Sequence, residues 1–221
     1  MKPVAAIRTP FGSAFGIPRQ PGLVAGVPGR IVFARPYRVR DAFKGLEGFS
    51  HVWVLWGFSL AKRTRFSPLV RPPRLGGNAT RGVFATRSPY RPNPLALSCV
   101  RLVRLEETAR EGTVLHVAGV DMADGSPVYD VKPYLPYADC VPEATGGFAA
   151  EPPRPRLAVE APAELLSRLP EELRGPLVSL LALDPRPPYQ NRPEREYGFP
   201  FAGKDIVFRV ADGKAFLLDI R

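Results

Sequence analysis

The sequence predicts a mainly β protein, with a single-sheet β-barrel as the N-terminal domain and a small α+β domain after it. Its 221 residues are 45% hydrophobic, which is enough for a buried core. Pro (27 residues) and Gly (20 residues) both exceed average usage, and such frequent breaks favour many short strands over long helices. The first ~140 residues hold six or seven strand-like segments and little helical periodicity, which suits a closed or nearly closed barrel.

The expected strands follow one another in short steps along the N-terminal part of the chain. Apolar or alternating patterns predict strands at 4–7, 31–34, 51–58, 82–85, 95–105, 113–121 and 128–135. The run HVWVLWGF at 51–58 is apolar enough for a strand buried on both faces. EETAREG is a turn, so the strands on either side of it are expected to pair as a hairpin. One short helix is expected, over 41–46.

The character of the sequence changes after residue 145. We expect residues 1–145 to form the barrel domain, residues 146–161, rich in Pro, Ala and Gly, to form a linker, and residues 162–221 to form a small α+β domain. The last of these contains two predicted helices and a hairpin with an Asp-Gly turn, at 163–169, 171–183 and 206–220.

The positive charge is confined to the expected barrel. The chain has a net charge of +10, and its sequence pI is about 10.1. Residues 1–145 hold 20 Lys and Arg against 10 Asp and Glu, whereas residues 146–221 hold 11 of each. Codon bias towards Arg is the alternative explanation, but it should enrich both parts alike. No acidic residue lies between Glu47 and Glu106, so this stretch is interpreted as a surface that faces phosphate or another anion.

Common enzyme signatures are missing from the sequence. There is no GxGxxG after a strand, no Walker A motif and no GxSxG elbow. With only His51 and His116, a His-based metal site is not expected. Cys99 and Cys140 form no CxxC pair or disulfide framework and are expected to be buried thiols. The absence of a signal peptide and of a long apolar run predicts a soluble cytoplasmic protein without membrane contact.

The loop GVFATRSPYRPNP at 82–94 is the most unusual segment. Its three prolines fix the backbone and lower the entropy cost of ordering it, so Arg87, Arg91 and Asn93 are presented on a stiff support. Such groups suit a polyanion or a zwitterionic cofactor. A structural Pro-rich turn with solvated arginines is the alternative, and the chemistry of the loop leaves both open.

A second segment, at 121–137, concentrates acidic and aromatic residues. In the predicted strand VYDVK, Asp130 and Lys132 are expected to share one face with Val128 and Tyr134. A carboxylate there would suit a sulfonium cation or a ribose diol. The alternative is an Asp-Gly turn followed by an exposed Asp–Lys pair.

The aromatic residues and His51 divide by their surroundings. His51, Trp53 and Trp56 occur in an apolar strand pattern and are expected in the core. Tyr90 and Phe15 occur in basic loops and are the better candidates for stacking against bases.

Taken together, these segments resemble the TsaA-like (TrmO) family, the tRNA N6-threonylcarbamoyladenosine methyltransferases. The matching pieces are PRQPGL at 18–23, GLEGFSHVWVL at 45–55, VRPPRLGGN at 70–78, GVFATRSPYRPNPLALS at 82–98 and DGSPVYDVKPYLPYAD at 124–139. DPRPPY at 184–189 resembles the C-terminal extension of the bacterial members, so the likeness spans most of the chain.

The resemblance implies a homodimeric enzyme that uses S-adenosyl-L-methionine (SAM) to methylate N6 of threonylcarbamoyladenosine next to the tRNA anticodon. By motif, the SAM contacts would fall on Pro18, Arg19, Gln20, Arg87, Leu97, Ala123, Asp124, Gly125 and Ser126. Ser59 stands where the family often has His, and it is included as a cofactor-binding candidate. Ser126 replaces the usual Thr and keeps the hydroxyl.

The remaining residues are assigned by chemistry. Methyl transfer to an acylated nitrogen needs its proton removed, so Asp130 or Tyr134 is the expected general base, with Lys132 as its electrostatic partner. The RNA-binding candidates are Arg71, Arg74, Arg81, Arg91 and Asn93. A non-catalytic RNA-binding β-barrel is the alternative function, and it would bind tRNA without binding SAM. A SAM-binding enzyme with a small substrate is disfavoured by the one-sided charge.

Overall fold

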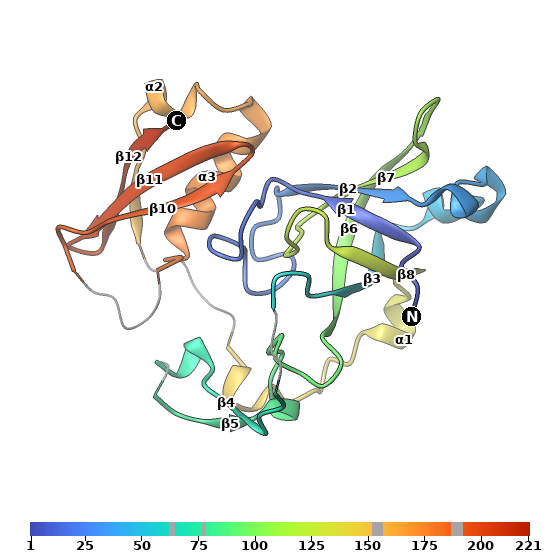
Figure 1. The fold of residues 1–221 in the computed structure, drawn as a ribbon, viewed down its shortest axis with the longest axis horizontal. Helices are drawn as coiled ribbons and strands as arrows, with labels where there is room; N and C mark the ends of the chain where they lie inside the picture. The colour runs from blue at the N-terminus through green and yellow to red at the C-terminus, as the bar shows by residue number, and fades with distance from the viewer. Residues whose placement is uncertain (62–64, 77, 152–156, 187–191) are drawn as a thin grey trace.

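A closed six-stranded barrel forms the N-terminal part of the protein, and a four-stranded sheet with one main helix forms the C-terminal part (Figure 1). The structure is a computed structural model, and it describes all residues except 62–64, 77, 152–156 and 187–191. The barrel strands, whose order around the barrel is β1-β2-β7-β6-β3-β8, are β1 (Ala5–Arg8), β2 (Pro28–Phe33), β3 (His51–Gly57), β6 (Leu95–Thr108), β7 (Gly112–Ala118) and β8 (Pro127–Pro133). The predicted single-sheet barrel is confirmed.

The barrel encloses one face of each strand. In β3, Val52, Val54 and Trp56 are buried, whereas His51 and Trp53 are only partly covered. The expectation that this strand is buried on both faces is wrong, because a barrel made of one closed sheet has an interior face and an exterior face. His51 and Trp53 therefore lie outside the core, and Trp56 lies inside it.

A β-bulge in β8 changes which of its side chains face outward. Trp56 pairs with Val128, but the preceding residue Leu55 pairs with Asp130, so β8 carries one extra residue at this point. Val128 is fully buried, while the Lys132 and Asp130 side chains are 72% and 46% exposed. The expectation that Asp130 and Lys132 share a face with Val128 is therefore wrong, because a bulge breaks the simple alternation of faces.

The segment predicted as a strand at 82–85 does not join the barrel. β5 is only Arg81–Gly82, and it pairs with β4 (Leu69–Val70) in a two-stranded ribbon that lies beside the barrel (Figure 1). The chain then closes a 3-10 turn at Val83–Ala85, where the Thr86 amide and hydroxyl both donate to the Val83 carbonyl. This local hydrogen bonding competes successfully with strand pairing.

Several of the other connections contain short helical turns. The expected helix at 41–46 is instead split into two 3-10 turns by Gly45, whose φ of 87° no helix accommodates. The short turns are η1 (Arg35–Tyr37), η2 (Arg40–Phe43), η3 (Leu46–Gly48), η4 (Pro73–Leu75), η5 (Val83–Ala85), α1 (Pro136–Asp139) and η6 (Gly147–Ala149). Cys140, directly after α1, is exposed and Cys99 is half-buried, so the expectation of two buried thiols is wrong.

The C-terminal sheet has the strand order β10-β11-β12-β9. Its elements are β9 (Ala158–Glu160), α2 (Ala163–Leu166), α3 (Glu171–Ala182), β10 (Glu196–Phe201), β11 (Lys204–Ala211) and β12 (Lys214–Ile220). β9 lies in the range expected to be a linker, and it pairs in parallel with β12. β10 was not expected, because EYGFPF contains Gly and Pro; its position at the sheet edge tolerates Pro200.

The segment between β1 and β2 joins the two parts of the protein (Figure 1). Phe11 forms a β-bridge with Phe201, and their ring centroids are 5.8 Å apart. Phe15 packs edge-on against Phe199 at 5.9 Å. The C-terminal sheet therefore holds in place the segment that carries PRQPGL. No helix in the described part of the chain has the length and apolar character needed to span a bilayer.

Candidate functional site

One end of the barrel gathers most of the predicted site segments, and we call this end the mouth. It is formed by the loop 18–23, the end of β3, the start of β6 and the connection 119–126 between β7 and β8. Hydrogen bonds tie these segments together: the Gly22 amide donates to the Gly119 carbonyl at 2.9 Å, and the Phe58 amide donates to the Pro94 carbonyl at 2.9 Å. Segments that lie up to about a hundred residues apart in sequence thus form one surface.

The motif PRQ (residues 18–20) and the motif TRS (residues 86–88) meet through their side chains. The Arg87 guanidinium donates from Nη1 to Gln20 Oε1 at 2.5 Å, and Gln20 Nε2 donates to the Arg19 carbonyl. Arg87 is exposed, whereas Pro18, the first residue of PRQ, is buried. A charged guanidinium is therefore held at the mouth by a neutral partner, which leaves its positive charge available to an anionic group.

A pair of hydroxyl groups lies beside the turn at the start of β8. Ser59 Oγ and Ser126 Oγ are 3.4 Å apart; Ser126 is fully buried, while Ser59 is exposed. Gly125 has a φ of 74°, and a Cβ built on it would have only Arg8 Nη1 nearby, at 4.0 Å. Ser59 thus lies beside this turn at the mouth, and open space adjoins the turn.

Ala123 and Asp124 support this turn, Ala123 from the interior and Asp124 from the surface. Asp124 accepts a hydrogen bond from the Thr9 amide at 3.0 Å and forms an ion pair with Arg8 at 3.4 Å. Ala123 is buried. Leu97 lies on the outer face of β6 and is 53% exposed, so an apolar side chain is accessible at the same end of the barrel.

Asp121 is a group at the mouth to which the sequence assigned no role. Its Oδ1 accepts a hydrogen bond from Ser98 Oγ at 2.7 Å, and Ser98 Oγ accepts one from Trp56 Nε1 at 2.9 Å. Burial raises the pKa of Asp121 from its ordinary value of 3.8 to about 6, while the Ser98 hydrogen bond and the Arg87 charge oppose that rise. The sequence could have drawn attention to Asp121, because it is an acidic residue within the otherwise apolar run GVDMA.

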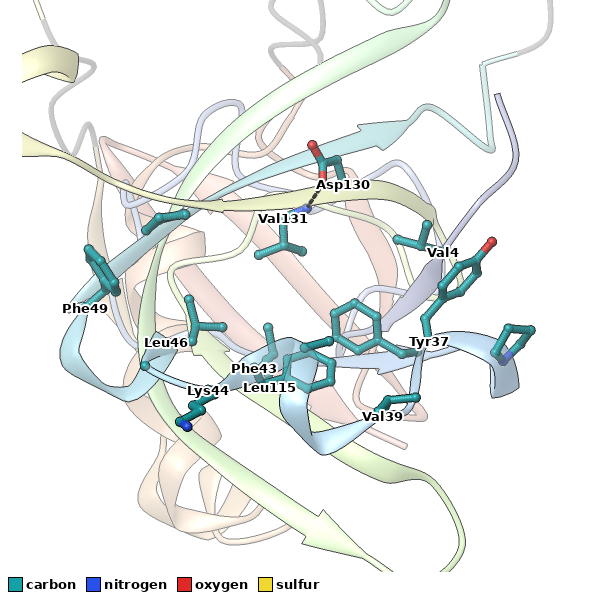
Figure 2. Close-up of a pocket in the computed structure, with 15 residues that line it drawn as sticks. Val4, Tyr37, Val39, Phe43, Lys44, Leu46, Phe49, Leu115, Asp130 and Val131 are labelled. Atoms are coloured by element: carbon teal, nitrogen blue, oxygen red, sulfur yellow. Dashed lines mark hydrogen bonds between the residues drawn. The ribbon is translucent and has the colours of Figure 1, made fainter.

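The three predicted catalytic residues lie along β8 and directly after it. Asp130 forms an ion pair with Lys132 at 2.9 Å, and its Oδ1 accepts from the Val131 amide. Figure 2 shows Val131 pointing into a pocket while the Asp130 carboxylate points away from it. Tyr134 packs against Trp53 with ring centroids 5.9 Å apart.

The strand register places the three residues at different heights along the barrel: Asp130 is level with Leu55 and Leu97, and Lys132 and Tyr134 lie successively further from Ser126. Tyr134 follows Ser126 by eight residues, with the whole of β8 between them, which corresponds to at most about 26 Å of extended chain. The pocket in Figure 2, of about 580 Å³, is lined by residues of the opposite barrel end, such as Phe33 and Phe43. The structure therefore sets Asp130 in one row with Leu55 and the predicted cofactor contact Leu97, whereas Tyr134 follows the end of β8 that lies away from Ser126. The catalytic roles of Asp130, Lys132 and Tyr134 stay a prediction.

The predicted RNA-binding arginines have different surroundings. Arg91 donates to the Thr86 carbonyl at 2.7 Å and lies 5.7 Å from the centre of the Phe84 ring, so it braces the TRS loop from inside. Arg74 donates to the Glu151 carbonyl, and Arg81 lies 5.7 Å from the centre of the Phe148 ring.

The other candidates for RNA contact are mostly on the surface. Arg71 and Asn93 are exposed, and Tyr90 is 40% exposed. Phe15 is instead packed against the C-terminal sheet, so its expected role in base stacking does not fit its position. Part of DPRPPY, residues 187–189, lies outside the described residues.

Comparison with known protein families agrees with this arrangement of segments. The family model for the tRNA-methyltransferase O N-terminal domain matches residues 6–140, and the model for the TrmO C-terminal domain matches residues 155–221. The chain belongs to the TrmO family. The two TrmO matches correspond to the barrel and to the C-terminal sheet with its helices.

Several TrmO relatives cover nearly the whole chain. A tRNA (adenine(37)-N6)-methyltransferase from Escherichia coli K12 is 40% identical over 230 aligned positions, covering 99% of this chain and 97% of the relative. A putative S-adenosylmethionine-dependent methyltransferase from Pseudomonas aeruginosa is 43% identical, covering 93% and 90%. The crystal structure of TrmO from P. aeruginosa superposes with a TM-score of 0.80 at 35% identity, covering 99% of this chain and 94% of that one.

Proposed function

We propose that this protein is a SAM-dependent methyltransferase that modifies N6 of adenosine 37 in tRNA. The observation that carries the proposal is the convergence of PRQ, TRS and DGSP at one barrel mouth, with Arg87 bonded to Gln20 and Ser59 beside Ser126. Relatives that cover almost the full chain bear this activity in their names.

The chemistry at the mouth fits SAM. Arg87 offers a positive charge to the amino-acid carboxylate, the exposed Ser59 hydroxyl suits a ribose hydroxyl, and the open space at Gly125 lets a ligand approach the backbone closely. SAM supplies the methyl group when bound. The proposed cofactor-binding residues are Pro18, Arg19, Gln20, Ser59, Arg87, Leu97, Ala123, Asp124, Gly125 and Ser126.

The proposed substrate is tRNA in which adenosine 37 carries a threonylcarbamoyl group. Exposed basic residues of the β4–β5 ribbon and its neighbours, Arg71 foremost among them, supply charge for phosphate contacts. The entire excess of positive charge lies in residues 1–145, on the part of the chain that forms the mouth. We further propose that the protein works as a homodimer, as the resemblance to the family implies.

Nucleoside mass spectrometry of tRNA from cells with and without the gene tests the proposal. Loss of the N6-methylated threonylcarbamoyl nucleoside, restored by the wild-type gene and not by an Arg87→Ala variant, supports it. An unchanged nucleoside profile would refute it.

Calorimetry with SAM distinguishes the proposed enzyme from the alternative function, a non-catalytic RNA-binding barrel. The enzyme gives saturable SAM binding to the purified protein. An RNA-binding module gives salt-dependent tRNA binding and no SAM binding.

A further inference from the structure

The hydrogen bonds around Asp121 have a direction that the chemistry of the groups fixes. The indole Nε1 of Trp56 can only donate, so Ser98 Oγ must accept from it at 2.9 Å. The single hydroxyl hydrogen of Ser98 is then directed to Asp121 Oδ1, at 2.7 Å. This chain of donors fixes one carboxylate oxygen and orients the side chain, while the other oxygen, Oδ2, takes no part in it.

The surroundings of Asp121 favour a carboxylate that can accept a proton. Ser98 and Trp56 are almost completely buried, at 1% and 4% exposure, so the carboxylate rests on the closed interior of the barrel. β3 and β6 present these neutral groups to it, and Arg87 is the charged group that acts on it from the TRS loop. The resulting pKa of about 6 leaves Asp121 mostly ionised at neutral pH but close to the pH of the reaction, which is where a general base works best.

Other acidic groups nearby are engaged in structural contacts. Asp124 is bound to the Thr9 amide and to Arg8, and Asp130 is bound to Lys132. Burial and the neighbouring Cys140, Cys99 and Asp139 raise the pKa of Tyr134, which moves that phenol away from the ionised form a base requires.

Resting on the proposed function, we propose that Asp121 is the proton acceptor in methyl transfer and that Ser98 and Trp56 are its positioning residues. The N6–H proton of the acylated adenosine passes to Oδ2 of Asp121. The electron pair left on N6 forms the new N–C bond with the methyl carbon as the C–S bond breaks, and the electrons of that bond stay on sulfur as a neutral thioether. The proton then leaves Asp121 for solvent.

An Asp121→Asn variant tests the role of the carboxylate, because it keeps the size of the side chain and removes the charge. Single-turnover methylation of tRNA at saturating SAM should fall by at least about a hundredfold, the usual contribution of a general base. The SAM dissociation constant should stay within about threefold of the wild-type value, since the lost interaction acts in the transition state. Glu107→Gln is the matched control: Glu107 also accepts a hydrogen bond from a hydroxyl, that of Thr113, on the distant β6–β7 hairpin.

The pH profile distinguishes a base from a structural role. The wild-type rate should rise about tenfold per pH unit up to about pH 6 and then level off, and Asp121→Asn should lack this rise. Ser98→Ala removes a hydrogen bond that lowers the pKa of Asp121, so the rising limb should move to higher pH. A carbon-13 NMR titration of the Asp121 carboxyl, without SAM or tRNA, should show the same movement between the wild type and Ser98→Ala.

Three results would overturn the inference: Asp121→Asn retains the single-turnover rate within about tenfold, the low-pH limb persists in it, or Ser98→Ala leaves the carboxyl titration unmoved. Should Asp121→Asn not fold, the Ser98→Ala titration and pH profile still decide the matter. If the wild-type protein itself methylates no tRNA, the proposed function fails, whereas a methylating wild type with an active Asp121→Asn refutes only the role of Asp121.

Discussion

Replacing Asp121 by Asn should make the protein more stable at neutral pH. Burial holds the folded-state pKa at about 6, above the ordinary 3.8 of an unfolded aspartate, so the folded state favours the protonated form. The stabilisation that this group gives to the folded state is fully present below pH 3.8. It is lost as the pH rises through about 6. The rise of the pKa from 3.8 to about 6 corresponds to a loss of about 3 kcal/mol of unfolding free energy at pH 7. Roughly half of this free energy is already lost near pH 5. Asn carries no charge and avoids this cost.

Urea unfolding of the wild type and of Asp121→Asn between pH 5 and 8 measures the effect directly. The difference in unfolding free energy should favour the variant and should grow by about 1 kcal/mol or more from pH 5 to 7. Titration of all other groups cancels in this difference. The exposed control Glu107→Gln should differ from the wild type by less than about 0.5 kcal/mol at every pH. A pH-independent difference for Asp121→Asn would refute the claim that its carboxylate is held at an energetic cost.

Three further predictions concern the loops and their support. Arg87→Ala should weaken SAM binding by about tenfold to a hundredfold in calorimetry, since a charge-assisted hydrogen bond contributes roughly 1.5–3 kcal/mol, and unchanged affinity would remove Arg87 from the site. Gly16→Ala should lower stability by about 2–4 kcal/mol in thermal unfolding, because Gly16 has a φ of 91° and a new Cβ would lie 2.5 Å from the Phe199 ring; a near-neutral result would contradict this packing. Arg71→Ala should reduce the salt slope of tRNA binding by about 1 with SAM binding retained, whereas Arg91→Ala, which frees the TRS loop, should weaken both; equal effects of the two variants would contradict the assignment.

Local patterns in the sequence were enough to predict most of the barrel. Strands such as 51–57 and 112–118 are short, nearly continuous apolar runs, and the short turn between β6 and β7 makes antiparallel pairing of these two strands the expected outcome. The bulge opposite Leu55 has no such local signature, because it depends on how β8 pairs with β3. This bulge is the reason that the expected face of Asp130 and Lys132 was wrong.

The residues of the site were predictable as motifs but not as an arrangement. PRQ, TRS and DGSP are recognisable in the chain, yet only barrel closure brings Gln20 to Arg87 and Ser59 to Ser126. The predicted strand already separates Tyr134 from Ser126, but the pairing that sets Asp130 beside Leu55 and Leu97 depends on the closed barrel. Asp121 was seen as one of several acidic residues, because its partner Ser98 lies on another strand and contributes only through the fold.

Methyl transfer by the purified protein tests most directly whether the barrel mouth is a SAM-dependent active site. Threonylcarbamoylated tRNA is incubated with the protein and SAM carrying a labelled methyl group, digested to nucleosides and analysed by mass spectrometry. We expect a labelled methyl on N6 of the threonylcarbamoyl nucleoside from position 37, with the reaction abolished by omission of SAM and at least about a hundredfold slower with Asp121→Asn. Saturable tRNA binding without any labelled nucleoside would contradict this expectation.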